Sequence, residues 1–326
     1  MAQTDDLLAR RRSELASRRA ALSALKQQEL ERLLNKTAAG QTPAPVIPKR
    51  PATGPAPLSF AQERLWFLDQ LEPDSVAYNV CIPLRLTGRL NVAALNQSIN
   101  EAARRHESLR TTFIEHEGRP AQVIASPQHH ELEVVDLSLL PEMERANVAR
   151  QLVHEGHRRR FNLPQGPLFQ STLLRLGAEE HVLLVLLHHI VFDDWSMQIL
   201  VHDVGENYQS FEQGVASSLP ELSIQYADFA HWHRDQLRDE VLEQELSYWR
   251  TQLEDSPPIM NLPTDRPRPA VMTYDGDAVR FTVPEELTEK LRSLTRSTGS
   301  SFFMTLLASF QMLLSRYTGQ DDVVVA

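Results

Sequence analysis

Residues 181–196 read HVLLVLLHHIVFDDWS, and this stretch decides the fold of the chain. Every position from 182 to 187 is apolar, whereas polar residues flank the run on both sides. A short, continuous apolar run is typical of a β-strand that is buried on both faces. We therefore predict a central strand over 181–187, then a polar loop, and then a helix over about 196–211.

The surrounding sequence alternates between strand and helix patterns, which predicts an α/β fold. Before the central strand, strands are expected over 79–86, 109–114, 133–136 and 168–176, and helices over 61–71, 92–106 and 141–159. A polar turn joins 168–176 to the central strand and indicates a hairpin. Past Pro220 the pattern restarts, with helices expected over 226–249, 285–298 and 301–317 and strands over 278–283 and from 323 onward.

The first 57 residues differ in composition from the rest. Residues 1–40 carry leucines at heptad spacing among good helix formers, which predicts a helical arm. Its apolar face fits either a solvated arm or a docking element for another chain. Six prolines fall within 41–57, so we interpret this stretch as a semi-rigid linker.

The composition excludes several classes of protein. Of 326 residues, 33 are Lys or Arg and 43 are Asp or Glu, and a net charge of -10 argues against a nucleic-acid partner. The single cysteine, Cys81, allows neither an intrachain disulfide nor a cysteine-based zinc site. No apolar run is long enough to span a bilayer, and the N-terminus lacks an apolar signal core. A cytoplasmic protein without a membrane partner is expected.

His188, His189 and Asp193 form the densest group of side chains that can carry chemistry. Side chains alternate along a strand, so the two histidines should point to opposite faces and not share a metal ion. One ring is then packed, and the other is free to exchange a proton near neutral pH. The spacing fits equally a core histidine pair with a helix-capping aspartate. A Ser-His-Asp hydrolase is disfavoured because Ser196 lacks a G-x-S-x-G turn, and no metal site is expected.

Four motifs resemble those of the condensation domains of nonribosomal peptide synthetases, within the chloramphenicol acetyltransferase-like superfamily. HHIVFD at 188–193 resembles the H-H-x-x-x-D-G active-site motif of that family. The stretches LSFAQERLWFL at 58–68, RHESLRTTF at 105–113 and YADFAHW at 226–232 resemble its opening motif, its second motif and the motif after the active site. The motifs come in the family's order, and the similarity covers about 58–326.

The resemblance implies an α/β, chloramphenicol acetyltransferase-like fold of two lobes with the active site in a tunnel between them. On this basis 58–225 is the N-terminal lobe, and 226–326 is a connecting helix followed by an incomplete second lobe. The helical arm at 1–40 and the proline-rich linker at 41–57 precede them. The later motifs of the second lobe are absent, so a truncated and inactive portion is expected.

The same resemblance implies amide formation between a donor acyl or peptidyl thioester and an aminoacyl acceptor. Both substrates arrive on the 4′-phosphopantetheine arms of carrier proteins, and the domain itself binds no cofactor. By position, His189 matches the catalytic histidine, either as a base or as a positioning group. His188 and Asp193 match structural positions.

Arginine partners are expected for the aspartate of the motif. Arg105 is the leading candidate for an ion pair with Asp193, and Arg280 is the second, because a buried carboxylate without a cation is costly. Arg110 is expected to form a structural ion pair.

Asp194 stands where the family has glycine, which adds a carboxylate beside the reacting centre. It either obstructs the donor channel, raises the pKa of His189, contacts an unusual substrate, or lies at the start of the next helix, where a carboxylate is favoured. The continuation from Trp195 resembles condensation domains that join two L-residues. Two alternatives stay open: a starter-type or ester-forming acyltransferase, and a non-catalytic carrier-protein docking module. The helices of 1–40 are a candidate contact to an upstream synthetase or polyketide synthase protein.

Overall fold

The computed structural model describes residues 46–51, 54–73, 75–257, 259–267, 269, 276 and 279–325. The arm expected over 1–40 lies outside the described residues, as do positions 41–45 of the proline-rich stretch. A compact unit begins at Lys49 and contains the sheets and helices that follow.

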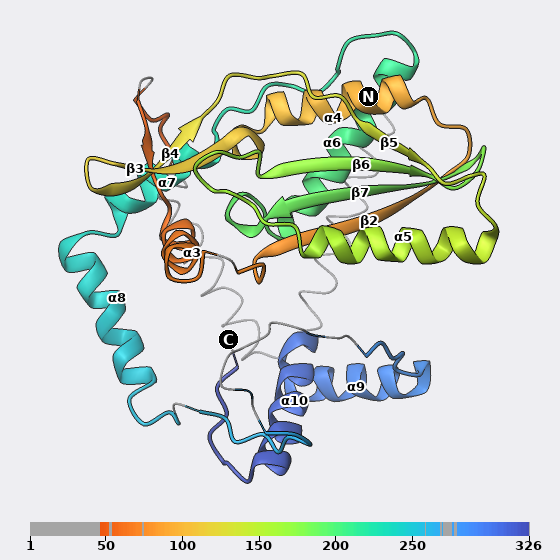
Figure 1. Cartoon of the computed structure of the whole chain (residues 1–326). Coiled ribbons are helices and arrows are strands. Elements are labelled where there is room, and N and C mark those ends of the chain that lie inside the picture. Colours follow the sequence, from red (N-terminus) through yellow and green to blue (C-terminus); the bar gives the residue numbers. More distant parts are fainter. Residues whose placement is uncertain are drawn as a thin grey trace, which may run out of the picture. The chain divides into compact units, whose positions relative to one another are not determined.

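The larger sheet has four strands in the order β2-β7-β6-β5 (Figure 1). In it, β7 (Glu180–His188) pairs antiparallel with both β2 (Asn79–Thr87) and β6 (Phe169–Arg175). The fourth strand, β5 (Glu133–Asp136), runs parallel to β6. The central strand predicted from the apolar run and the hairpin predicted from the polar turn before it are therefore confirmed.

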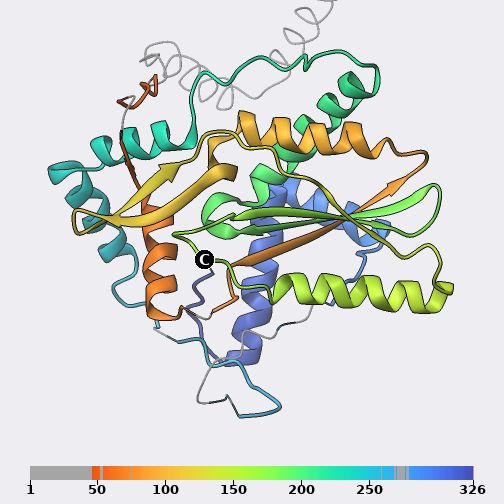
Figure 2. The same cartoon turned by 45° about the horizontal axis from the view of Figure 1, so that its top comes forward.

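The two faces of β7 contribute to two separate hydrophobic clusters. Positions 183, 185 and 187 join the larger cluster, which also holds residues of α4 (Val92–Arg105) and α6 (Asp194–Glu212). Positions 184 and 186 join the smaller cluster, against α5 (Glu142–His157). The two views show α5 and the pair α4 and α6 on different sides of the sheet (Figures 1 and 2). Helices on both faces explain why this strand has no polar position from 182 to 187.

The smaller sheet has three strands in the order β1-β4-β3. Its strands are β1 (Ala56–Pro57), β4 (Arg119–Ile124) and β3 (Thr111–His116). A 3₁₀ turn, η1 (Glu107–Arg110), precedes β3, so the strand starts two residues later than the sequence predicted. Since β1 belongs to the sheet and Leu58 is 1% exposed, the lobe extends into the stretch interpreted as linker.

A capping residue fixes one helix start within one residue of its predicted position. Ser59 caps α3 (Phe60–Leu71) in a capping box with Gln62. The helix expected over 226–249 is interrupted, giving α7 (Tyr226–Gln236) and α8 (Asp239–Gln252). Asp239 and Glu240 lie in the first turn of α8, where the helix dipole favours acidic side chains, and Asp239 itself has a positive φ of 46°.

The last part of the described chain contains α9 (Glu285–Thr298) and α10 (Phe302–Thr318). Both agree with the predicted helices, and Gly319 ends α10 in the left-handed conformation that favours glycine. The strands expected over 278–283 and from 323 are not formed at 279–283 and 323–325, and neither sheet includes these residues. A strand requires a hydrogen-bonded neighbour, which the described segments do not provide there. Among the described helices, none has the length and apolarity needed to cross a bilayer.

Candidate functional site

His188 is the last residue of β7 and is buried, with 6% of its surface exposed. Its ring lies edge-on to Phe161, with the ring centroids 6.1 Å apart, and its Nδ1 accepts the backbone N–H of Ile190 at 3.1 Å. Burial, with a smaller contribution from the neighbouring His189, lowers the pKa of His188 to about 4. The ring is therefore neutral at physiological pH and fixes the turn that ends the strand.

His189 starts the short 3₁₀ turn η2 (His189–Val191) and is exposed. Its backbone N–H donates to the Tyr78 carbonyl at 2.8 Å, so pairing between β2 and β7 continues one residue past the strand end. One ring is packed and the other is accessible, as the sequence predicted, although the turn η2 and not alternation along the strand separates them.

His189 lines a cavity of about 340 Å³. The other walls come from α3, from the residue before β2, from η1, from the start of α6 and from α7, with Gln62, Arg64, Tyr78, Ser108, Ser196 and Tyr226 among the lining residues. Ser59 and Tyr226 share a hydrogen bond of 3.0 Å between their hydroxyls, which ties the start of α7 to the cap of α3. All four stretches that carried the family motifs therefore contribute residues to this cavity.

Asp193 also lines this cavity, but the arginine partner expected for it is a wrong prediction. Asp193 is the N-cap of α6: its Oδ1 accepts the backbone N–H of Ser196 at 2.9 Å and the Ser196 hydroxyl at 2.5 Å. Among the residues that the structure describes, neither Arg105 nor Arg280 forms an ion pair with it. Because Asp193 is exposed, it does not require a cation to offset burial.

Arg105 pairs instead with Asp203, in the interior of α6. Its Nε lies 2.8 Å from Asp203 Oδ2, and the same oxygen lies 2.7 Å from His106 Nε2. Arg105 and Asp203 are 8% and 4% exposed. A buried carboxylate does have its arginine, but the sequence interpretation chose the wrong aspartate. The sequence could have indicated the correct partner, because Asp203 lies three residues after Leu200 and therefore on the same, buried face of the helix.

The three remaining residues expected at the site do not line the cavity. Arg110 ends η1, where its Nη1 donates to the Ala125 carbonyl and its Nη2 lies 3.9 Å from Glu107 Oε1, so it supports the turn before β3. Asp194 is the first residue of α6 and is exposed, and Trp195 beside it is 76% exposed. The cap of α6 is Asp193, not Asp194.

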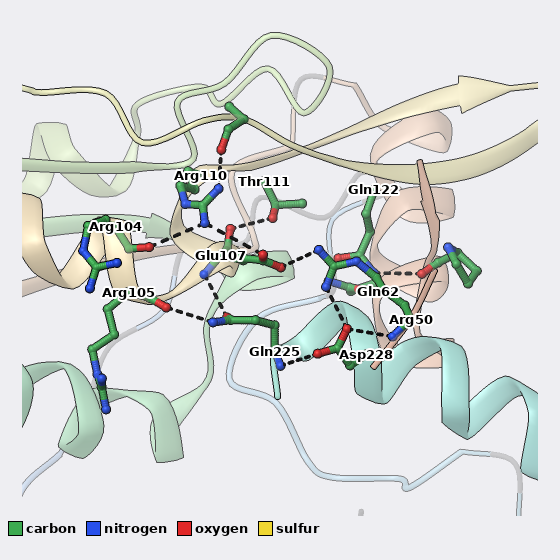
Figure 3. A network of polar contacts seen from close by, with 12 residues as sticks. Arg50, Gln62, Arg104, Arg105, Glu107, Arg110, Thr111, Gln122, Gln225 and Asp228 are labelled. Atoms are coloured by element: carbon green, nitrogen blue, oxygen red, sulfur yellow. Dashed lines mark hydrogen bonds and ion pairs between the residues drawn. The ribbon is translucent and has the colours of Figure 1, made fainter. Parts of the chain in front are cut away.

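A polar network joins two of the elements that contribute residues to the cavity, η1 and α7 (Figure 3). Arg50 bridges Glu107 and Asp228, with both nitrogen–oxygen distances at 2.8 Å. Gln225 accepts from the Glu107 backbone N–H at 3.1 Å and donates to the Arg105 carbonyl at 3.0 Å. The network joins η1 to α7, and Ser108 and Tyr226, next to these residues in the chain, line the cavity.

Gln62 holds the turn that carries His189. Its Nε2 donates to the Ile190 carbonyl at 3.3 Å, and its Oε1 accepts the Ser59 backbone N–H at 3.0 Å. This role was missed in the sequence, although the Ser-x-x-Gln spacing of a capping box marked the pair. The described residues contain no group of three or more His, Cys, Asp or Glu side chains placed to hold a metal ion.

Comparison with known proteins shows which protein family the chain resembles. The family model for the condensation domain matches residues 52–326. A linear gramicidin synthase protein from Brevibacillus parabrevis is 47% identical over 286 residues, which is 88% of this chain and 4% of that protein. Phosphinothricin tripeptide synthetase PhsC from Streptomyces viridochromogenes is 44% identical over 313 residues, or 96% of this chain and 29% of that protein.

Solved structures share the fold. The X-domain from teicoplanin biosynthesis matches with a TM-score of 0.74 and 28% identity, over 84% of this chain and 60% of that one. The first condensation domain of the calcium-dependent antibiotic synthetase, solved with a substrate analogue, matches with a TM-score of 0.70 and 24% identity, over 84% of this chain and 64% of that one. The chain therefore spans less than two thirds of these solved chains and less than a third of the two synthetases.

Proposed function

The chain belongs to the condensation-domain family, and we propose that the complete domain to which these residues belong forms an amide bond between two carrier-bound substrates. The α/β fold and the four motifs predicted from sequence agree with this membership. The donor is an acyl or peptidyl thioester, and the acceptor is an aminoacyl thioester. Two carrier proteins deliver them on 4′-phosphopantetheine arms. Peptide synthetases among the relatives support this substrate class.

In the proposed reaction the acceptor amine attacks the carbonyl carbon of the donor thioester. A C–N bond forms and the C–S bond breaks, the amine nitrogen loses one proton, and the departing pantetheine sulfur takes up one proton. His189 is the proposed group at the amine, where its imidazole accepts the proton or holds the nucleophile in place. His188, neutral and buried, keeps the turn below it in position.

The observation that carries this proposal is the position of His189, an exposed imidazole on a turn fixed by Tyr78, His188 and Gln62, at the wall of a cavity. Such a side chain reaches a bound molecule without distortion of the strand that carries it. Asp193 adds a carboxylate to the same cavity. Asp194, at the first position of α6, has a proposed structural role, because acidic side chains are favoured at a helix N-terminus.

The test loads one carrier protein with a labelled acyl group and a second with an amino acid, and measures labelled amide on the second. We expect His189→Ala to lower the rate by roughly 10²–10⁴-fold, the usual contribution of a general acid–base group. His154→Ala is the matched control, because His154 is an exposed histidine on α5 away from the cavity. Equal rates for the His189 and His154 variants, with both folded, would exclude His189 as the reacting group.

A docking function is the second candidate, supported by a structure of the teicoplanin X-domain in complex with OxyB. That structure matches this chain with a TM-score of 0.73 and 29% identity. If the protein binds both loaded carriers but forms no amide or ester, the docking function is favoured. An ester formed from a hydroxyl acceptor would indicate the ester-forming alternative.

A further inference from the structure

A second, smaller cavity of about 90 Å³ lies beside the one that His189 lines. Four residues line both cavities: Ser108, Val191, Phe192 and Ser196. The shared residues place the two spaces side by side. A side group of a molecule bound next to His189 enters the smaller space only by passing between these four residues. The smaller cavity is called the side pocket below.

The side pocket is lined mainly by hydrocarbon. Leu109, Val191, Phe192 and Leu200 are all less than 9% exposed, and Ile199 forms a more open part of the wall. None of its lining residues is an Asp, Glu, Lys or Arg. A group that enters it gains the free energy of apolar burial, whereas a charged group would lose its hydration without a partner.

Two of the three polar side chains of the wall, His106 and Ser196, have partners within the protein, and Ser108 is the third. His106 Nε2 lies 2.7 Å from Asp203 Oδ2, and the charge of Asp203 is offset by Arg105 at 2.8 Å. The Ser196 hydroxyl donates to Asp193 at 2.5 Å. These contacts hold the wall in shape and leave its aliphatic surface as the main means of recognition.

The volume limits the group that fits. About 90 Å³ is three times the roughly 30 Å³ that a water molecule occupies in the liquid, which is room for three or four carbon atoms. We propose that the side pocket selects the aliphatic side chain, of valine or leucine size, on one of the two amino acids that the protein joins. This inference rests on the proposed function, but it concerns recognition and not the chemical step.

The experiment measures binding separately from turnover. Aminoacyl-pantetheine amides, which do not hydrolyse like thioesters, are made with alanine, valine, leucine and glutamate and titrated against the intact protein. One series keeps a free amine and represents the acceptor, and the other is N-acetylated and represents the donor. The series that shows a side-chain preference identifies the substrate that uses the pocket.

Two variants on α6 form a matched pair. Ile199→Phe fills the side pocket, whereas Val201→Phe adds a ring to the same helix at a residue that lines neither cavity. Ile199 and Val201 are 42% and 46% exposed, so we expect both variants to fold.

Wild type should bind valine and leucine analogues about tenfold or more tightly than alanine or glutamate, since one methylene in an apolar pocket is worth roughly 10–200-fold. Ile199→Phe should reduce this preference about tenfold while alanine binding stays within about twofold, and Val201→Phe should match wild type. Equal affinities for the four side chains in both series, or an unchanged preference in Ile199→Phe, would overturn the inference. Selective binding without amide formation would retain the side pocket and refute the proposed function.

Discussion

Replacement of Arg50 by methionine tests whether the lobe depends on a residue from the proline-rich stretch. Methionine keeps an unbranched stem but removes the guanidinium, which bridges Asp228 and Glu107 at 2.8 Å each. The Asp228 side chain is 5% exposed, so solvent screens its attraction to Arg50 only weakly. We expect a clear loss in the free energy of unfolding.

The size of the expected loss in unfolding free energy depends on the hydrogen bonds that Asp228 keeps after the substitution. Removing one partner of a buried ion pair costs about 3–5 kcal/mol. Asp228 still accepts the Gln225 backbone N–H at 2.8 Å and the backbone N–H of residue 50 at 3.2 Å, which reduces the penalty. We therefore expect a loss of about 2–3 kcal/mol, in the range of one or two charged hydrogen bonds.

Urea unfolding at pH 7 measures this loss, and Arg85→Met is the control. Arg85 pairs with Glu180 at 2.7 Å, but these side chains are 71% and 42% exposed, so the change should cost no more than about 1 kcal/mol. A double-mutant cycle of Arg50→Met with Asp228→Asn should give a coupling energy of about 1 kcal/mol or more. If Arg50→Met cost no more than Arg85→Met, the argument from burial would be refuted.

Two further predictions concern the N-terminal segment and pH. Deletion of 1–48 should leave the midpoint of thermal unfolding nearly unchanged. Deletion of 1–55 also removes Arg50 and should lower this midpoint by about 5–10 °C. Equal midpoints for the two deletions would show that Arg50 contributes nothing to stability. The pKa of His188 falls from 6.5 in the unfolded chain to about 4 in the fold, so the unfolded chain binds more protons and stability should be lost as the pH falls from about 6.5 to 4. The loss reaches roughly 3 kcal/mol, and His188→Asn should flatten this part of the stability–pH curve; an unchanged slope would contradict the burial of a neutral ring.

Local patterns predicted the parts of the fold that depend on neighbouring residues in the chain. The apolar run 182–187 specified β7 because only a strand covered on both faces buries every position. The start of α3 lies one residue from the predicted position, and the capping box of Ser59 and Gln62 that fixes it is a local hydrogen-bond pattern. The opposite environments of His188 and His189 agree with the prediction, but β7 ends at His188, and the turn η2 rather than strand alternation directs His189 away from the core.

Long-range partners were not predictable in this way. The sequence placed Arg105 with Asp193, but Asp193 satisfies the first turn of α6 locally, and Arg105 pairs with Asp203 further along the helix. Asp193 and Asp203 belong to the same helix, as its cap and as an interior residue. Only the packing of α4 against α6 determines which of the two aspartates pairs with Arg105. The contact from Arg50 to Asp228, across 178 positions, has no local signal either.

The two adjacent histidines have different roles because one ring is buried at the end of β7 and the other lies on the turn that follows. Burial keeps His188 neutral, and only a neutral ring leaves Nδ1 free to accept the Ile190 N–H. That bond ends β7 and turns the chain, so the next ring leaves the core at the cavity wall. Gln62 holds the Ile190 carbonyl from the other side, so both backbone groups of residue 190 are fixed. The position of His189 therefore depends on the uncharged state of His188, because a protonated Nδ1 could no longer accept the Ile190 N–H.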